Sequence, residues 1–264
     1  MIRSRSIIVP VECTINFKEK LLKIVLWDLE TAPLVVTSWG LFKPYLSHDN
    51  ILEDTSLICA AWKDLEEKVV HSVAINPADP RNDQRVVEEL REALGEADVL
   101  VGHNGDKFDL KTFNARLIFH GLKPLPPIKT VDTLKVARKN FRFTSNRLDY
   151  LGRFLGVGRK LHTDYSLWLD ILLRGDEKAL AKMVAYNKQD VLLLQKVYNK
   201  LKPYMANHPN RRLCDGEVCP ICGVKDSLQK RGFRLTQLSK SQAYQCQVCG
   251  GWSKGRPEER TDIA

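Results

Sequence analysis

Two acidic side chains stand close together in a segment that is otherwise apolar. Asp28 and Glu30 are two residues apart in the stretch Ile24-Val-Leu-Trp-Asp-Leu-Glu-Thr31. This composition predicts a β-strand over Lys23–Leu29. Residues i and i+2 of a strand project from the same face. Two carboxylates on one face at the end of a strand favour binding of a divalent cation.

A third carboxylate follows a second apolar segment. We expect a strand over Asp98–His103 and a helix over Lys107–His120, with Asp109 at the turn between them. Active sites of α/β proteins commonly assemble at strand ends of this kind. The position of Asp109 therefore predicts a third acidic group beside the site.

The fourth carboxylate lies within a long predicted helix, Glu177–Leu201. Tyr186 and Asp190 are four residues apart, which places the phenol and the carboxylate on one helix face, one turn apart. Met183 and Val191 belong to the same face. Taken alone, Asp190 would be interpreted as part of a solvated helix surface.

Each of these patterns is weak alone, since an Asp-x-Glu at a strand end is more often a solvated edge or a helix cap. In this order they resemble the three motifs of the DnaQ-like, or DEDD, superfamily of 3′–5′ exonucleases: D-x-E, N-x-x-x-F-D and Y-x-x-x-D. The likeness covers about residues 23–203. It is closest to the tyrosine subtype, related to the exonuclease domain of family B DNA polymerases, in a standalone phage or bacterial type. Ala185, five residues before Asp190, excludes the histidine subtype.

The resemblance implies an α/β fold of ribonuclease H type, with a mixed β-sheet flanked by helices. It also implies a two-metal-ion mechanism for hydrolysing phosphodiester bonds, with two Mg²⁺ or Mn²⁺ ions. Tyr186 would orient the attacking water, because a phenol with a pKa of roughly 10 is a poor base at neutral pH. Asn104 and Phe108 match substrate-side positions, and core packing is an equal alternative for Phe108. The residues implied as metal ligands are Asp28, Glu30, Asp109 and Asp190.

A basic stretch with interleaved aromatic residues runs from Lys129 to Lys160, with nine Lys or Arg against two acids. Cations that follow phosphates beside rings that stack on bases are typical of nucleic-acid binding. Ordinary amphipathic packing is the alternative. We expect Tyr150 and Phe154 to lie mostly in the core. The residues expected near the nucleic acid are Arg138, Lys139, Arg142 and Arg147.

Four cysteines form two C-x-x-C pairs near the C-terminus, Cys219 with Cys222 and Cys246 with Cys249. The 23 residues between the pairs are enough for a β-hairpin, and the spacing predicts a structural Zn²⁺ site in a small zinc ribbon. A glycine after each pair permits the tight turn. We expect Cys214 to be free. The ribbon's cations and rings favour nucleic acid as its partner, and docking on a protein is the alternative.

The composition bounds the rest of the organisation. The 264 residues suffice for one α/β core and a small module. We predict a nuclease domain over residues 23–204 and the zinc ribbon with its tail over 205–264. Residues 1–22 are either a disordered extension or an over-long start assignment. The net charge of +9 favours a polyanionic partner. No apolar run reaches the roughly 18 residues of a membrane helix, so we expect a cytoplasmic protein that does not bind a membrane.

The sequence therefore predicts a 3′–5′ exonuclease, with single-stranded DNA favoured over RNA. The alternative is a nucleic-acid-binding adaptor, in which the zinc ribbon accompanies an inactive nuclease-like domain. Acids displaced from one another would favour the adaptor. The sequence gives no indication of the oligomeric state.

Overall fold

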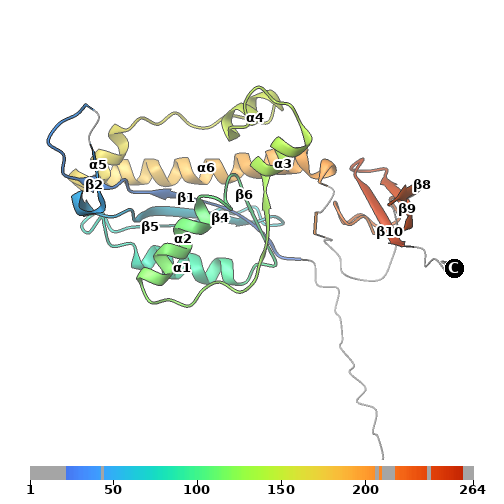
Figure 1. Ribbon diagram of the computed structural model, residues 1–264, viewed down its shortest axis with the longest axis horizontal. Coiled ribbons are helices and arrows are strands. Elements are labelled where there is room, and N and C mark those ends of the chain that lie inside the picture. Colours follow the sequence, from blue (N-terminus) through green and yellow to red (C-terminus); the bar gives the residue numbers. More distant parts are fainter. Residues whose placement is uncertain (1–21, 43–44, 206–207, 210–217, 237–238, 258–264) are drawn as a thin grey trace, which may run out of the picture.

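The computed structural model describes residues 22–42, 45–205, 208–209, 218–236 and 239–257. The predicted extension, apart from Leu22, and Cys214 lie outside the described residues. The fold is mixed α/β, as predicted, with helices on both sides of a central sheet and a small separate sheet near the C-terminus (Figure 1). No helix among the described residues is long and apolar enough to cross a membrane.

Five strands of the described chain form the central sheet, in the order β5-β4-β1-β6-β7. The central strand β1 pairs antiparallel with β4 and parallel with β6, and β6 pairs parallel with β7. The sheet is therefore mixed, as the family resemblance implied, with an antiparallel part β1–β4–β5 and a parallel part β1–β6–β7. The bounds are β1 Ile24–Thr31, β4 Leu57–Asp64, β5 His71–Ala74, β6 Val99–Gly102 and β7 Lys129–Asp132.

The helix α6 crosses one face of the sheet, and α1 and α2 cover the other (Figure 1). Because β1 is covered on both faces, it carries apolar side chains on both. On one face Leu26 joins a cluster with Leu194 of α6. On the other, Trp27 meets Phe113 of α2 edge-on, with 6.1 Å between the ring centroids. The alternation places Asp28 and Glu30 on the α6 side. The helices are α1 Gln84–Gly95, α2 Asp109–Phe119, α3 Thr133–Asn140, α4 Leu148–Phe154, α5 Ser166–Arg174 and α6 Glu177–Leu201, with short 3-10 helices η1 His48–Asn50 and η2 Lys202–Tyr204.

Two segments contain only short strands. Between Leu34 and Phe42 only β2, Val35–Val36, is extended, and its partner β3, Ile51–Glu53, is also very short. The strand β7 was not expected. It occupies an edge of the sheet and, being short and partly polar, has no apolar alternation that would reveal it.

A buried ionic cluster joins α1, α2 and β4. The Asp83 carboxylate is fully buried and accepts from Arg116 Nε and Nη2 at 2.7 and 2.8 Å, and it contacts His120 Nε2 at 2.7 Å. It also accepts the backbone N–H of Leu57 at 2.8 Å. Burial alone would raise the pKa of Asp83, but these hydrogen bonds outweigh burial and lower it. The cluster therefore holds three elements together through a charged, fully paired group.

The C-terminal module is a three-stranded antiparallel sheet in the order β10-β9-β8 among the residues described there. Its strands are β8 Leu228–Leu235, β9 Lys240–Cys246 and β10 Trp252–Pro257. The predicted hairpin between the cysteine pairs is β8–β9. Few apolar side chains are buried there: Ile221 packs with Cys219 and Cys246 in a very small cluster. The module therefore needs a source of stability other than a hydrophobic core.

Candidate active site

Three carboxylates converge between β1 and α6. One oxygen from each of Asp28, Glu30 and Asp190 lies within 4.8 Å of the others. The strand period places the first two side chains on the face that α6 covers, and the helix brings Asp190, which is buried, against them. Sequence and topology together thus produce an acidic cluster at the sheet–helix boundary.

Asp109 lies beside this cluster but is not part of the group within 4.8 Å. It is buried as the first residue of α2, where the Leu29 backbone N–H hydrogen-bonds its carboxylate. A tight turn sets this position: Asn104 adopts a left-handed φ of 68°, and its N–H donates to Asp132 Oδ1 at 2.9 Å. A Cβ on Gly105 would lie 3.3 Å from the Gly102 Cα, so glycine permits the close approach.

Burial and mutual repulsion disfavour the ionised form of the carboxylates in the site. Burial and repulsion from Asp190 raise the pKa of Glu30 from 4.5 to about 7. Burial raises the pKa of Asp109 to about 6, and burial with repulsion from its acidic neighbours raises the pKa of Asp28 well above its usual value. A cation among these groups would relieve both the repulsion and the cost of burying charge.

The structure places a lysine that sequence reasoning did not assign to the site. Lys160 Nζ lies 2.5 Å from Asp190 Oδ2 and donates to the Tyr186 hydroxyl at 3.2 Å. Burial disfavours its charged form, but the carboxylates of Asp190 and Asp28 outweigh burial and raise its pKa. Lys160 stands in the irregular segment between α4 and α5, where no periodicity distinguishes it from the other cations of the basic stretch.

Asn187 is a second residue that the sequence did not reveal. It is fully buried on α6, and its Nδ2 donates to Asp28 Oδ2 at 2.8 Å. Its position three residues before Asp190 puts both on the inner face of the helix. Asn187 therefore fixes one oxygen of Asp28 without adding charge.

The donor set fits a divalent cation. The ligand atoms are carboxylate oxygens, which hard cations such as Mg²⁺ and Mn²⁺ prefer. In the described part of the chain, the buried Asp190 Oδ1 has no hydrogen-bond donor, so it is available as a ligand. The residues able to hold cations here are Asp28, Glu30 and Asp190, with Asp109 adjacent.

The residues predicted to lie near substrate separate into two groups. Asn104, Arg138 and Arg147 line a hollow of about 660 Å³. Lys160, which contacts Asp190, lines the same hollow and connects it with the acidic cluster. Lys139 lines a different hollow, beside β7 and α3, and Arg142 is exposed in the loop after α3.

The aromatic predictions for this region divide in a similar way. Phe108 is 47% exposed, so it is not a core residue. Tyr150 is partly buried against the core, but Phe154 is 61% exposed, and its expected place in the core is wrong. The short helix α4 turns the Phe154 ring outward, against Phe143.

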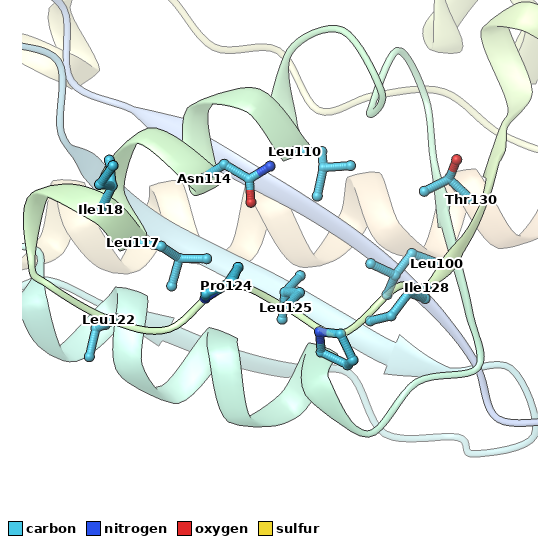
Figure 2. Close-up of a pocket in the computed structure, with 11 residues that line it drawn as sticks. Leu100, Leu110, Asn114, Leu117, Ile118, Leu122, Pro124, Leu125, Ile128 and Thr130 are labelled. Carbon is cyan, nitrogen blue, oxygen red and sulfur yellow. The ribbon is translucent and has the colours of Figure 1, made fainter.

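A separate apolar hollow of about 460 Å³ lies between α2 and the segment leading into β7. Figure 2 shows leucines of α2 on one wall and Pro124, Leu125 and Ile128 on the other. None of its lining residues is a carboxylate, and it lies on the side of the sheet opposite α6. The hollow therefore takes no part in the acidic site.

The four predicted zinc ligands converge in the C-terminal module. Their sulfurs all lie within 4.8 Å of one another, with Sγ–Sγ distances of 3.8 Å for Cys219 and Cys249 and 3.7 Å for Cys222 and Cys246. A tetrahedral zinc ion at about 2.3 Å from each sulfur requires a separation of about 3.8 Å. Gly223 and Gly250 adopt φ of 79° and 72° at the turns after each pair. The arrangement is compatible with one Zn²⁺.

Comparison with known families identifies the larger domain. The family described as RNase_H superfamily matches residues 52–202, more than half of the chain. The chain belongs to the RNase H superfamily. The matched residues include Asp109, Tyr186 and Asp190, whereas Asp28 and Glu30 on β1 precede the match.

Two known proteins illustrate how this RNase H-superfamily chain relates to others. It is 24% identical over 200 residues to a DNA polymerase III PolC-type of Ureaplasma parvum serovar 3, covering 70% of this chain and 13% of that protein. It superposes on a family B DNA polymerase from the hyperthermophilic archaeon Pyrobaculum calidifontis with a TM-score of 0.50 at 16% identity, covering 69% of this chain and 25% of the other. The second likeness concerns the fold alone.

Proposed function

We propose that this chain is a metal-dependent 3′–5′ exonuclease of the tyrosine subtype, which removes nucleotides from the 3′ end of single-stranded DNA. The observation that carries the proposal is the convergence of Asp28, Glu30 and Asp190 beside Tyr186. The similarity in sequence to a protein named as a DNA polymerase supports DNA as the substrate. Because the acids converge, the adaptor alternative loses the feature that would have favoured it.

Tyr186 and Asn187 have separate roles in hydrolysis. When bound, two divalent cations supply a hydroxide at neutral pH and offset charge on the leaving oxygen. The Tyr186 hydroxyl, which accepts from Lys160, positions the attacking water by hydrogen bonding. Asn187 holds Asp28 in place, since it donates to one carboxylate oxygen. Each side chain thus orients a ligand or the nucleophile.

The hollow beside the acidic cluster receives the end of the strand. Arg138, Arg147 and Lys160 line it together with Asn104 and His103. Burial lowers the pKa of His103 to about 4, so this imidazole is neutral at physiological pH. Its two ring nitrogens contact Thr133 Oγ1 and the Asn146 carbonyl oxygen, each at 2.9 Å, so His103 fixes the wall of the hollow. The two arginines face phosphates, for which their planar guanidinium groups are suited.

The deciding experiment is digestion of end-labelled nucleic acid with Mg²⁺ or Mn²⁺. We expect 5′-labelled single-stranded DNA to shorten in single-nucleotide steps, faster than duplex DNA or RNA of the same sequence. Asp190→Asn should abolish turnover, and Tyr186→Phe should slow single-turnover cleavage with nearly unchanged substrate binding. Glu88→Gln, on the exposed face of α1, is the matched control. Full activity of Asp190→Asn would reject the proposal.

A further inference from the structure

We infer that the cleft between the end of α6 and the zinc ribbon binds a nucleotide of the substrate strand, several positions upstream of the 3′ end. The inference rests on the proposed function, because it takes the 3′ terminus to occupy the acidic cluster. The cleft measures about 480 Å³. Its walls come from η2 on one side and from the ribbon strands on the other.

The cleft combines exposed rings with cations. Tyr204, Phe233 and Trp252 line it and are 59%, 52% and 50% exposed. Arg231 and Arg234 line it as well, and neither forms an ion pair within the described chain. Aromatic faces that stack on bases, beside cations that follow the backbone, are what single-stranded nucleic acid requires.

The charge of the ribbon selects a polyanion over a neutral partner. Among the described side chains of residues 218–254 there are six Lys or Arg and one acid, Asp226. The edge strand β8 is almost wholly exposed and carries both arginines of the cleft. A further cation lies against one ring of the cleft, since Lys240 Nζ is 3.8 Å from the centre of the Phe233 ring. A protein partner held by apolar contact would not require this excess of cations.

The ribbon meets the nuclease domain directly at this cleft. A Cβ on Gly251 would lie 3.4 Å from the Pro203 Cα, so the two backbones are in close contact there. Met205, at the end of η2, is buried and lines the cleft. The cleft is therefore a composite site that neither part forms alone.

A row of rings connects the cleft with α4, the helix that precedes Lys160. Tyr204 meets Phe141 edge-on at 4.9 Å, Phe141 stacks on Phe143 at 4.9 Å, and Phe143 meets Phe154 at 5.1 Å between centroids. The exposed ends of the row, Tyr204 and Phe154, point to a path for the strand along this side of the molecule. The same stretch of chain, from α3 to α4, also carries four exposed cations: Lys139, Arg142, Arg147 and Arg153.

The distance from the acidic cluster to the cleft sets how long an oligonucleotide must be to reach both. Asp190 and Tyr204 are separated along α6 and η2 by about 21 Å at 1.5 Å per residue. At about 3.4 Å per stacked nucleotide this is roughly six nucleotides. An oligonucleotide of four residues that occupies the acidic cluster is then too short to reach the cleft, whereas one of twelve residues reaches it.

The test is binding of fluorescent oligothymidylates of four and twelve residues, measured by anisotropy without Mg²⁺ or Mn²⁺ to prevent cleavage. We expect Arg231→Ala/Arg234→Ala to weaken binding of the 12-mer by at least about tenfold and to lower its log–log salt slope by about 1.4, at about 0.7 for each lost contact. Trp252→Ala should weaken it by about fivefold or more, through lost stacking. Binding of the 4-mer should be unchanged.

The controls separate the possible failures. Arg85→Ala/Arg91→Ala on α1 removes equal charge far from the cleft and should leave both affinities unchanged. One zinc per chain in each ribbon variant shows that the module is folded. If the ribbon variants bind the 12-mer with unchanged affinity, or lose equal affinity for the 4-mer and the 12-mer, the inference that the cleft binds the strand is overturned. Turnover of the 4-mer with Mn²⁺ reports on the acidic cluster alone, so its absence in the wild type rejects the proposed function instead.

Discussion

The isosteric substitution Glu30→Gln tests most directly how far the ionised carboxylates of the acidic cluster destabilise the folded protein. In the metal-free protein, burial and repulsion raise the pKa of Glu30 from 4.5 to about 7, so the folded state binds its proton more tightly than the unfolded state does. The stability contributed by this proton is therefore complete below pH 4.5. It is lost as the pH rises towards 7, and it does not change above that.

The size of the loss follows from the same two values. Each pKa unit corresponds to 1.36 kcal/mol, so the rise from 4.5 to about 7 makes the free energy of unfolding about 3 kcal/mol smaller at pH 8 than at pH 4.5. Glutamine has no proton to lose. Because Glu30 also raises the pKa of Asp28, its removal relieves part of the strain there too. Glu30→Gln should therefore be more stable than the wild type at pH 8 by about 3 kcal/mol.

The assay is urea unfolding followed by circular dichroism between pH 5 and pH 8, with zinc retained and no Mg²⁺ or Mn²⁺ added. The wild type should lose stability across this range, and Glu30→Gln should lose much less. Saturating Mn²⁺ should flatten the pH dependence of the wild type, because a bound cation favours the ionised carboxylates. Glu92→Gln, an exposed position on α1, is the control. Equal pH dependence in the wild type and Glu30→Gln would refute the reasoning.

Three further predictions concern the lysine, the buried ionic cluster and the zinc site. Lys160→Met should lower the Mn²⁺ concentration that gives half-maximal thermal stabilisation, because the ammonium at 2.5 Å competes with a cation for Asp190; a higher or unchanged concentration would contradict this. Asp83→Asn should lower the free energy of unfolding by about 3–5 kcal/mol, since it leaves Arg116 buried without its partner, and a loss below about 1 kcal/mol in urea titration would contradict the importance of the pair. Cys219→Ser should lose zinc, measured by atomic absorption, and the ribbon's strand signal, while the nuclease domain keeps its melting transition.

Local patterns were enough to predict the elements that carry the acids. The two-residue period of β1 puts Asp28 and Glu30 on one face, and the helical spacing puts Tyr186 and Asp190 on another. These periods follow from backbone geometry, which is the same wherever the element is packed. The same holds for the cysteine pairs, whose spacing reflects a turn of fixed size.

Contacts between distant segments were decided only by the tertiary structure. Lys160 reaches Asp190 from an irregular loop 30 residues away, and Asn187 reaches Asp28 across 159 residues. The sequence could not indicate either contact, because a loop has no period and a buried asparagine looks the same as an exposed one. The sequence alone thus determined which faces bear the acids, through periods intrinsic to strand and helix. Packing of α6 on the sheet decided how close those faces come and which neutral and cationic groups lie between them, because burial makes each carboxylate depend on its nearest partners.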